Sequence, residues 1–334
     1  MGRAIIAVVL RIEVLDPADD SAIAAACEVL SECDRELFGD LEPPRSTALQ
    51  RSWLAPMAGR VRHAWLADDG TRPVGFAALQ LRNGSGNDHL GWVREFVVTP
   101  DARRQGIGRA LLDRLCATAS DGGRTLLALR HAQHDVAAST FADAIGMSEA
   151  LRVDQRRLEL ARGVMPVARA ELPSGLEFVA WDGHCPDDLI DAYCAAHEFM
   201  HDAPRPPSTN AWRVTADEVR AYETVAAAHG GEHWVVGLRR IGASALLGYS
   251  EVYFEPGEPW LARQGDTGID PRWRRRGLGR ALKLVNLRRL VRERPDVRTV
   301  ETFNASDNTG MIALNDSLGF RLATRWQERE LALR

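Results

Sequence analysis

The pattern of apolar and polar positions occurs twice along the chain. In each half, an apolar segment ends in a polar turn and is followed by a second apolar segment opened by glycine, which predicts a β-hairpin. A strand, a glycine turn and a long helix follow, and a last strand closes the half. The matching segments are 63–81 with 233–254, 93–112 with 264–283, and 145–160 with 318–333. A period of about half the chain indicates a duplicated domain rather than a solenoid.

The same pattern predicts further elements around each hairpin. Before the hairpins we expect strands at 5–15 and 176–181 and helices at 21–33 and 186–197. After the glycine-turn helix we expect a strand at 125–129 or 299–303, then a helix and the last strand. This order predicts an α/β (α+β) fold of two tandem domains, each a central mixed β-sheet flanked by helices. The predicted domains are residues 1–161 (the first half) and 174–334 (the second half), with a linker at 162–173 where glycine and proline interrupt the pattern.

Composition excludes several classes of protein. The 334 residues hold 42 Lys and Arg against 46 Asp and Glu, a formal net charge of −4 without long runs of one sign, which disfavours a nucleic-acid partner. Lys283 is the only lysine. The apolar stretch at 5–10 is interrupted by Arg11 and Glu13 before it reaches the length of a signal peptide or a membrane span. The five cysteines form no C-x-x-C pair. We therefore expect a cytoplasmic protein without nucleic-acid or membrane partners.

The glycine turns carry the first chemical signal. In each half, Arg-x-x-Gly-x-Gly opens a helix directly after an apolar strand. A helix N-terminus presents free N–H groups and partial positive charge, and glycine lets the backbone approach a phosphate closely. Residues 104–109 and 275–280 are therefore predicted to bind a pyrophosphate. One copy alone is explained by a glycine that tightens a turn, but two copies in register favour binding. No Gly-Lys-Ser/Thr and no third Rossmann glycine is present. Charge-assisted contacts are expected from Arg103, Arg104, Arg274, Arg275 and Arg276.

The segments RRQGIGRA, RRRGLGRA and NASDNTGMIALNDSLGF (304–320) resemble the GNAT superfamily of acyl-CoA-dependent N-acetyltransferases, in its tandem two-domain actinobacterial form. The resemblance covers nearly the whole chain. It implies direct transfer of an acetyl group from acetyl-CoA to a primary amine, with pantetheine paired to the strand at 96–98 or 267–269. In the second half, the implied acetyl-CoA contacts are Thr267, Gly268, Ile269, Arg274, Arg275, Arg276, Gly277, Leu278, Gly279, Arg280, Asn304 and Asn308. In the first half they are Phe96, Val97, Val98, Arg103, Arg104, Gln105, Gly106, Ile107, Gly108 and Arg109.

Acidic residues beside this strand are the candidate catalytic bases. Asp266 and Glu95 occupy equivalent positions, where the resemblance implies an acidic residue, and Glu251 on the preceding strand is a third candidate. The alternative for each is a solvated or salt-bridged strand carboxylate. The family's tyrosine acid is absent from both halves, and Asn315 stands at its position in the second. An asparagine can hydrogen-bond the sulfur but cannot protonate it, so either the thiolate leaves without an acid or Tyr249 or Tyr253 serves.

The second half matches the family pattern better and is the expected catalytic domain. It holds Asn304 and Asn308 where the first half has His131 and Asp135, and Gly-Phe where the first has Gly-Met. The first half is expected to bind coenzyme A silently, to act on a substrate of its own, or only to support a dimer-like pairing of the two domains. The acceptor is expected to be a small-molecule or peptide amine held by loops near 34–60 and 200–225. We expect a monomer with pseudo-dimeric tandem domains, or a homodimer.

Two other functions fit parts of the sequence. A coenzyme A-binding protein with a degenerate, non-catalytic domain or a regulatory role accounts for the missing tyrosines. HEFMH at 197–201 matches the zinc-hydrolase motif H-E-x-x-H, in which two histidines on one helix face bind zinc. No third ligand pattern follows it and the first half has no counterpart. We therefore expect no metal and place His197 and His201 near the acceptor pocket.

Overall fold

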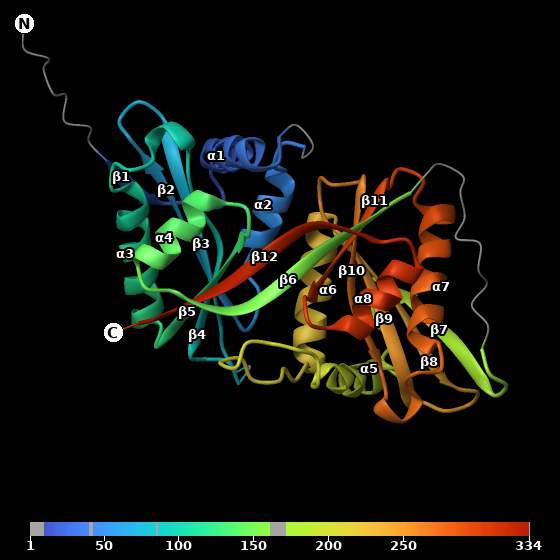
Figure 1. Cartoon of the computed structure of the whole chain (residues 1–334). Helices are drawn as coiled ribbons and strands as arrows, with labels where there is room; N and C mark the ends of the chain where they lie inside the picture. The colour runs from blue at the N-terminus through green and yellow to red at the C-terminus, as the bar shows by residue number, and fades with distance from the viewer. Residues whose placement is uncertain (1–9, 40–42, 85, 161–171, 334) are drawn as a thin grey trace, which may run out of the picture.

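The computed structural model describes residues 10–39, 43–84, 86–160 and 172–333. Within these ranges, one mixed β-sheet of twelve strands passes through both halves, with helices on its two faces (Figure 1). The strand order is β1-β2-β3-β4-β5-β12-β6-β11-β10-β9-β8-β7. The predicted fold class of mixed sheet and flanking helices is confirmed.

The duplicated order of elements is visible in both halves. The first half contains β1 (Arg11–Val14), α1 (Asp20–Phe38), α2 (Thr47–Leu54), β2 (Arg60–Asp68), β3 (Pro73–Arg82), β4 (Leu90–Val98), α3 (Ile107–Asp121), β5 (Leu126–Ala132), α4 (Val136–Ala144) and β6 (Ser148–Glu159). The second contains β7 (Leu176–Asp182), α5 (Ile190–Ala196), α6 (Ala216–His229), β8 (Glu232–Arg240), β9 (Leu246–Phe254), β10 (Leu261–Ile269), α7 (Leu278–Glu293), β11 (Thr299–Ala305), α8 (Thr309–Ser317) and β12 (Arg321–Ala332). The strand expected at 5–15 is shorter than predicted in the described part, and residues 1–9 lie outside it.

The alternation of side chains along β3 builds two apolar layers in the first half. Ala77 and Leu79 pack with Leu115 of α3, whereas Phe76 packs with Ile23 of α1 on the other face. Successive side chains of a strand point to opposite faces, so the apolar run from Pro73 to Leu79 of β3 serves both layers.

The last strand of each half lies in the sheet of the other half. β6 pairs antiparallel with β11, and β12 pairs antiparallel with both β5 and β6. Figure 1 shows these two strands crossing from one half of the molecule to the other. The predicted domain boundaries stay a prediction, and most of the predicted linker, residues 161–171, lies outside the described residues.

Two parallel strand pairs separate before they end. β10 pairs with β11 only from Leu261 to Arg263, although β10 continues to Ile269. β4 pairs with β5 only from Leu90 to Val93 and likewise continues. The remaining part of each longer strand therefore has backbone groups on that side that its parallel neighbour does not pair. Each of these strands leads directly into a glycine turn.

Candidate active site

The two glycine turns have the same backbone conformation. Gly106 and Gly277 stand at φ +87° and +76°, and Arg104 and Arg275 at φ +64° and +60°. A Cβ atom built on either glycine meets nothing within 4 Å. No side chain caps the start of α3 or α7. Both helix N-termini thus fit the predicted anion-binding turn, because left-handed glycine geometry leaves open space before uncapped N–H groups.

Two of the predicted arginines brace these turns. Arg274 donates from Nε to the carbonyl oxygen of Ile269 over 2.9 Å and also pairs with Asp202. Arg103 pairs with Glu36, through a 2.8 Å contact from Nη1 to Oε1, in the equivalent place. These guanidinium groups hold the end of the strand and a neighbouring helix or loop together. Their predicted contacts with a pyrophosphate stay a prediction.

Glu251 of β9 lies in an enclosed polar cluster between the sheet and α5. Its side chain accepts hydrogen bonds from the hydroxyls of Tyr253, over 2.8 Å, and Tyr193. His197 Nε2 lies 3.5 Å from Glu251 Oε1, and burial lowers the pKa of His197 to about 4, which leaves the imidazole neutral at pH 7. Burial raises the pKa of Glu251 to about 7, against the opposing effect of the tyrosine hydrogen bonds. Glu251 is therefore poised to exchange a proton near neutral pH.

Asp266 stands next to this cluster at a β-bulge in β10. The register with β9 shifts between Gln264 and Thr267, so two residues of β10 oppose one of β9. Gly265 allows this close approach, since a Cβ there would lie 2.4 Å from a ring carbon of Tyr253. Asp266 is exposed, yet desolvation by the surrounding protein, followed by the charge of Glu251, raises its pKa to about 6. The cluster therefore pairs one enclosed carboxyl group with one that solvent reaches.

Asn315 and Asn304 belong to a second buried cluster, on the α7 and α8 side. Asn315 Nδ2 donates to Asn304 Oδ1 over 2.7 Å, and Asn315 Oδ1 accepts from Lys283 Nζ over 2.8 Å. Burial lowers the pKa of Lys283 to about 7. Asn308 caps α8 by accepting from the backbone N–H of Met311 over 3.1 Å. Its implied acetyl-CoA contact stays a prediction.

The first half lacks both clusters. β4 has its bulge at the equivalent position, but Glu95 there pairs with Arg45, at 3.4 Å from Nη1 to Oε1. In the strand register, Ala78 of β3 lies opposite Glu95 and is therefore the counterpart of Glu251. Ala78 is fully buried. Glu95 thus has the ion-paired environment named as its alternative, and no second carboxyl group faces it from β3.

The HEFMH segment does not present its histidines as a pair. It begins at the end of α5 and continues as a 3₁₀ turn over His197–Met200. The ring of His197 contacts the Tyr249 hydroxyl through Nδ1 at 3.0 Å, whereas His201 Nε2 lies 2.7 Å from the carbonyl oxygen of Trp212. Among the described residues, no three His, Cys, Asp or Glu side chains are grouped to hold a metal ion. The zinc alternative gains no support from this arrangement.

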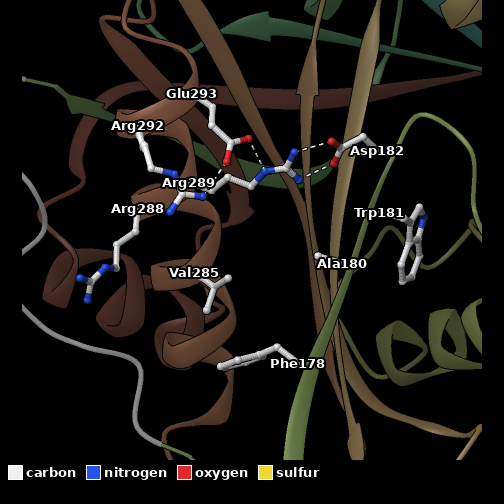
Figure 2. Close-up of a pocket in the computed structure, with 9 residues that line it drawn as sticks. All are labelled: Phe178, Ala180, Trp181, Asp182, Val285, Arg288, Arg289, Arg292 and Glu293. Carbon is white, nitrogen blue, oxygen red and sulfur yellow. Dashed lines mark hydrogen bonds and ion pairs between the residues drawn. The ribbon is translucent and has the colours of Figure 1, made fainter.

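A separate hollow of about 740 Å³ opens between β7 and α7 (Figure 2). Arg289 crosses it and pairs with Asp182 of β7 and Glu293 of α7. None of the site residues predicted from sequence lines it. The lining residues are Phe178, Ala180, Trp181, Asp182, Val285, Arg288, Arg289, Arg292 and Glu293.

Sequence reasoning found the carboxyl groups but missed the residues around them. Tyr193 comes from α5, and nothing in its local sequence marks it as a partner of Glu251. Lys283 did carry a signal, because it is the only lysine of the chain and stands where the first half has Leu112.

No helix in the described part of the chain is long and apolar enough to cross a membrane.

The duplicated sheet, the separating parallel strands and the glycine turns define a tandem acetyltransferase fold. The sequence profile of the "Acetyltransferase (GNAT) family" matches residues 23–147. A mycothiol acetyltransferase of Geodermatophilus obscurus is 30% identical over 315 residues, which cover 92% of each chain. One of Clavibacter sepedonicus is 28% identical over 76% of this chain and 84% of its own. A tandem GNAT protein from the clavulanic acid biosynthesis pathway superposes with a TM-score of 0.82 at 28% identity, covering 98% of this chain and 99% of that one. The chain belongs to the GNAT family and is an acyl-CoA-dependent N-acetyltransferase.

Proposed function

We propose that this enzyme transfers an acetyl group from acetyl-CoA to the primary amine of a small molecule, directly within a ternary complex, at a site in the second half. The observation that carries the proposal is the pair Glu251 and Asp266 beside the end of the β10–β11 pairing. Their pKa values, raised to about 7 and about 6, suit groups that take up a proton near neutral pH. The mycothiol acetyltransferases among the relatives support a small-molecule acceptor.

The residues of the second glycine turn fit acetyl-CoA. Gly277 leaves open space before the uncapped start of α7, where a pyrophosphate would be held with help from Arg275, Arg276 and Arg280. The part of β10 that β11 does not pair offers backbone groups to a pantetheine arm. When bound, acetyl-CoA supplies the thioester carbonyl that the amine attacks.

The two carboxyl groups have different tasks in this proposal. Asp266 is exposed and takes the proton from the acceptor's ammonium group, which frees the nitrogen for attack. Glu251 is enclosed beside it. Desolvation, followed by the charge of Glu251, raises the pKa of Asp266 and so makes it a stronger base. The hydrogen bond from Tyr253 fixes the orientation of Glu251. The neutral imidazole of His197 lies beside the Glu251 carboxyl group.

Acetyl-CoA binding and amine acetylation are measured separately to test the proposal. Native mass spectrometry counts acetyl-CoA bound per chain, and thiol release is followed with a panel of amino sugars, amino acids and short peptides. We expect turnover with at least one amine and a loss of about 100-fold or more in Asp266→Asn. Binding without turnover on any amine favours a regulatory coenzyme A-binding protein. The absence of binding at near-millimolar acetyl-CoA contradicts the proposed function.

A further inference from the structure

The single lysine of the chain is buried inside the second half. Lys283, on the second turn of α7, is 1% exposed and Asn315 is completely buried. The Lys283 ammonium donates to Asn315 Oδ1 over 2.8 Å, and its Nζ lies 5.8 Å from the centre of the Phe320 ring. No carboxylate of the described residues lies within ion-pair distance of this nitrogen. An ammonium group held this way is costly to bury, because it loses its water without gaining a contacting anion.

The fold itself does not need this lysine. At an offset of 171 the first half has Leu112 in place of Lys283, and at an offset of 173 it has Ala142 in place of Asn315. Both are buried apolar residues. In the first half, α3 and α4, the counterparts of α7 and α8, therefore pack on the sheet with an apolar pair at these positions. The polar pair occurs only in the half that holds the carboxyl cluster.

Lys283 is linked through Asn315 to Asn304 of β11, which lies beyond the last residue of β11 that pairs with β10. α7 and α8 touch, since a Cβ on Gly279 would lie 3.3 Å from a methyl carbon of Leu314. Asp266, at the bulge of β10, is close enough to influence the charge of Lys283. The tyrosines lie on the other side of the sheet: Tyr253 donates to Glu251 and Tyr249 contacts His197.

We propose that Lys283, oriented by Asn315, is the acid that protonates the sulfur of the departing coenzyme A. This inference rests on the proposed function. The amine nitrogen forms a bond to the thioester carbon, the carbon–sulfur bond breaks, and its electron pair stays on sulfur. Lys283 gives one proton to that thiolate and becomes a neutral amine. It regains a proton through water from the protonated nitrogen of the newly formed amide, while the proton first taken by Asp266 leaves to solvent.

The acidity of the buried ammonium suits this task. An ordinary lysine, with a pKa of about 10.4, is a weaker acid than a thiol of pKa about 8.5 and does not protonate its thiolate favourably. Burial lowers the pKa of Lys283 to about 7, below that of the thiol, so that the transfer runs downhill. Asn315 has no proton of this acidity to give.

Nuclear magnetic resonance on the intact protein tests whether Lys283 meets the sulfur. Because the chain has one lysine, protein labelled with lysine that carries ¹³C only at Cε gives a single side-chain signal, which Lys283→Arg removes. We expect coenzyme A to shift this signal and its titration midpoint, and desulfo-coenzyme A to leave the midpoint as in the free protein. Equal effects of the two ligands overturn the proposal for Lys283. If calorimetry detects no binding of either ligand, the proposed function fails instead.

Kinetics with an amine from the turnover screen provide the second test. Lys283→Leu with Asn315→Ala reproduces the apolar pair of the first half, so we expect it to fold. We expect kcat to fall about 100-fold, KM for acetyl-CoA to stay within about threefold, and the alkaline decline of kcat to disappear. Lys283→Arg keeps the charge but has no proton to give at this pH, and its kcat is expected to fall similarly.

The matched control is Asn286→Leu, one turn further along α7, where the first half has Leu115; its kcat and pH profile are expected to stay unchanged. An unchanged kcat or alkaline limb in the double variant overturns the acid role. An acetyl group found on Lys283 by mass spectrometry after incubation with acetyl-CoA also overturns it, because the lysine is then a nucleophile.

Discussion

The buried side chain of Gln155 on β6 donates from Nε2 to Glu301 Oε2 on β11 over 2.9 Å, which joins the last strand of the first half to a strand of the second. Gln155 Oε1 in turn accepts from Trp326 Nε1 on β12 over 3.1 Å. Because these three strands are neighbours in one sheet, separating the halves would break three whole strand pairings, β6–β11, β12–β5 and β12–β6, as well as these side-chain contacts. The two halves are therefore joined through one continuous sheet.

A cut between the halves is expected to leave them together. If a protease site is inserted at 162–173 and cleaved, β6 and β12 still hold the fragments through backbone pairing. Size-exclusion chromatography in native buffer is expected to show both fragments in one peak, and they are expected to separate in denaturant. Independent elution of the fragments in native buffer would mean that the exchanged strands contribute little.

Activity is expected to depend on pH through the carboxyl pair. Asp266 acts as a base only when ionised, and its pKa is raised to about 6. We expect kcat/KM for the amine to fall tenfold per pH unit below that value, after correction for protonation of the amine itself. In Glu251→Gln the neighbouring negative charge is gone, so this limb should move to lower pH. A limb that stays in place would show that the two carboxyl groups do not interact.

The stability of Glu251→Gln is expected to differ from the wild type mainly at high pH. Folding raises the pKa of Glu251 from 4.5 to about 7, so the folded chain keeps this proton while the unfolded chain has lost it. Wild-type stability therefore declines between these values and stays lower above them. Urea unfolding at pH 8.5 is expected to show the variant more stable by roughly 1–3 kcal/mol, with little difference near pH 4.5. Equal differences at both pH values would contradict an ionised, enclosed Glu251.

The two glycine turns offer a matched pair of substitutions. A tryptophan at Gly277 has to adopt φ near +76° and projects into the open space before α7. We expect Gly277→Trp to weaken acetyl-CoA binding at least tenfold and to abolish turnover, at a stability cost of about 1–2 kcal/mol. Gly106→Trp has the same strain at φ +87° and serves as its control. The reverse result, with turnover lost only in Gly106→Trp, would place catalysis in the first half.

Residues of the first half also contact the backbone of a loop in the second half, at Ser208 and Asn210. Asn87 Oδ1 accepts from the backbone N–H of Asn210 over 2.7 Å, and His89 Nε2 lies 2.8 Å from the carbonyl oxygen of Ser208. Because residues 200–225 are the predicted acceptor loop, Asn87→Ala is expected to raise KM for the amine about five- to tenfold. Calorimetry should find the affinity for acetyl-CoA unchanged. A change in acetyl-CoA affinity with an unchanged KM for the amine would assign this loop to the other substrate.

Local sequence predicts the order of the strands and helices. It also identifies one part of the candidate site, namely the glycine turns and the two carboxyl groups. A glycine with a left-handed φ between an apolar strand and a helix is a local requirement, so both turns were predictable from Gly106 and Gly277. Asp266 and Glu251 were identified because each lies on a strand whose place in the repeat is clear. His197 was noticed within a zinc motif, but its contact with Glu251 depends on how α5 packs on the sheet.

Local sequence accounts for the duplication, the order of strands and helices, and the positions of the glycine turns, because hydrophobic period and backbone preference act over a few residues. The exchange of β6 and β12 between the halves follows from tertiary packing, since either sheet edge can satisfy the hydrogen bonds of a strand. Tertiary packing also buries Glu251 and Lys283. Their altered pKa values arise from desolvation by residues distant in the chain, and no local pattern encodes that environment.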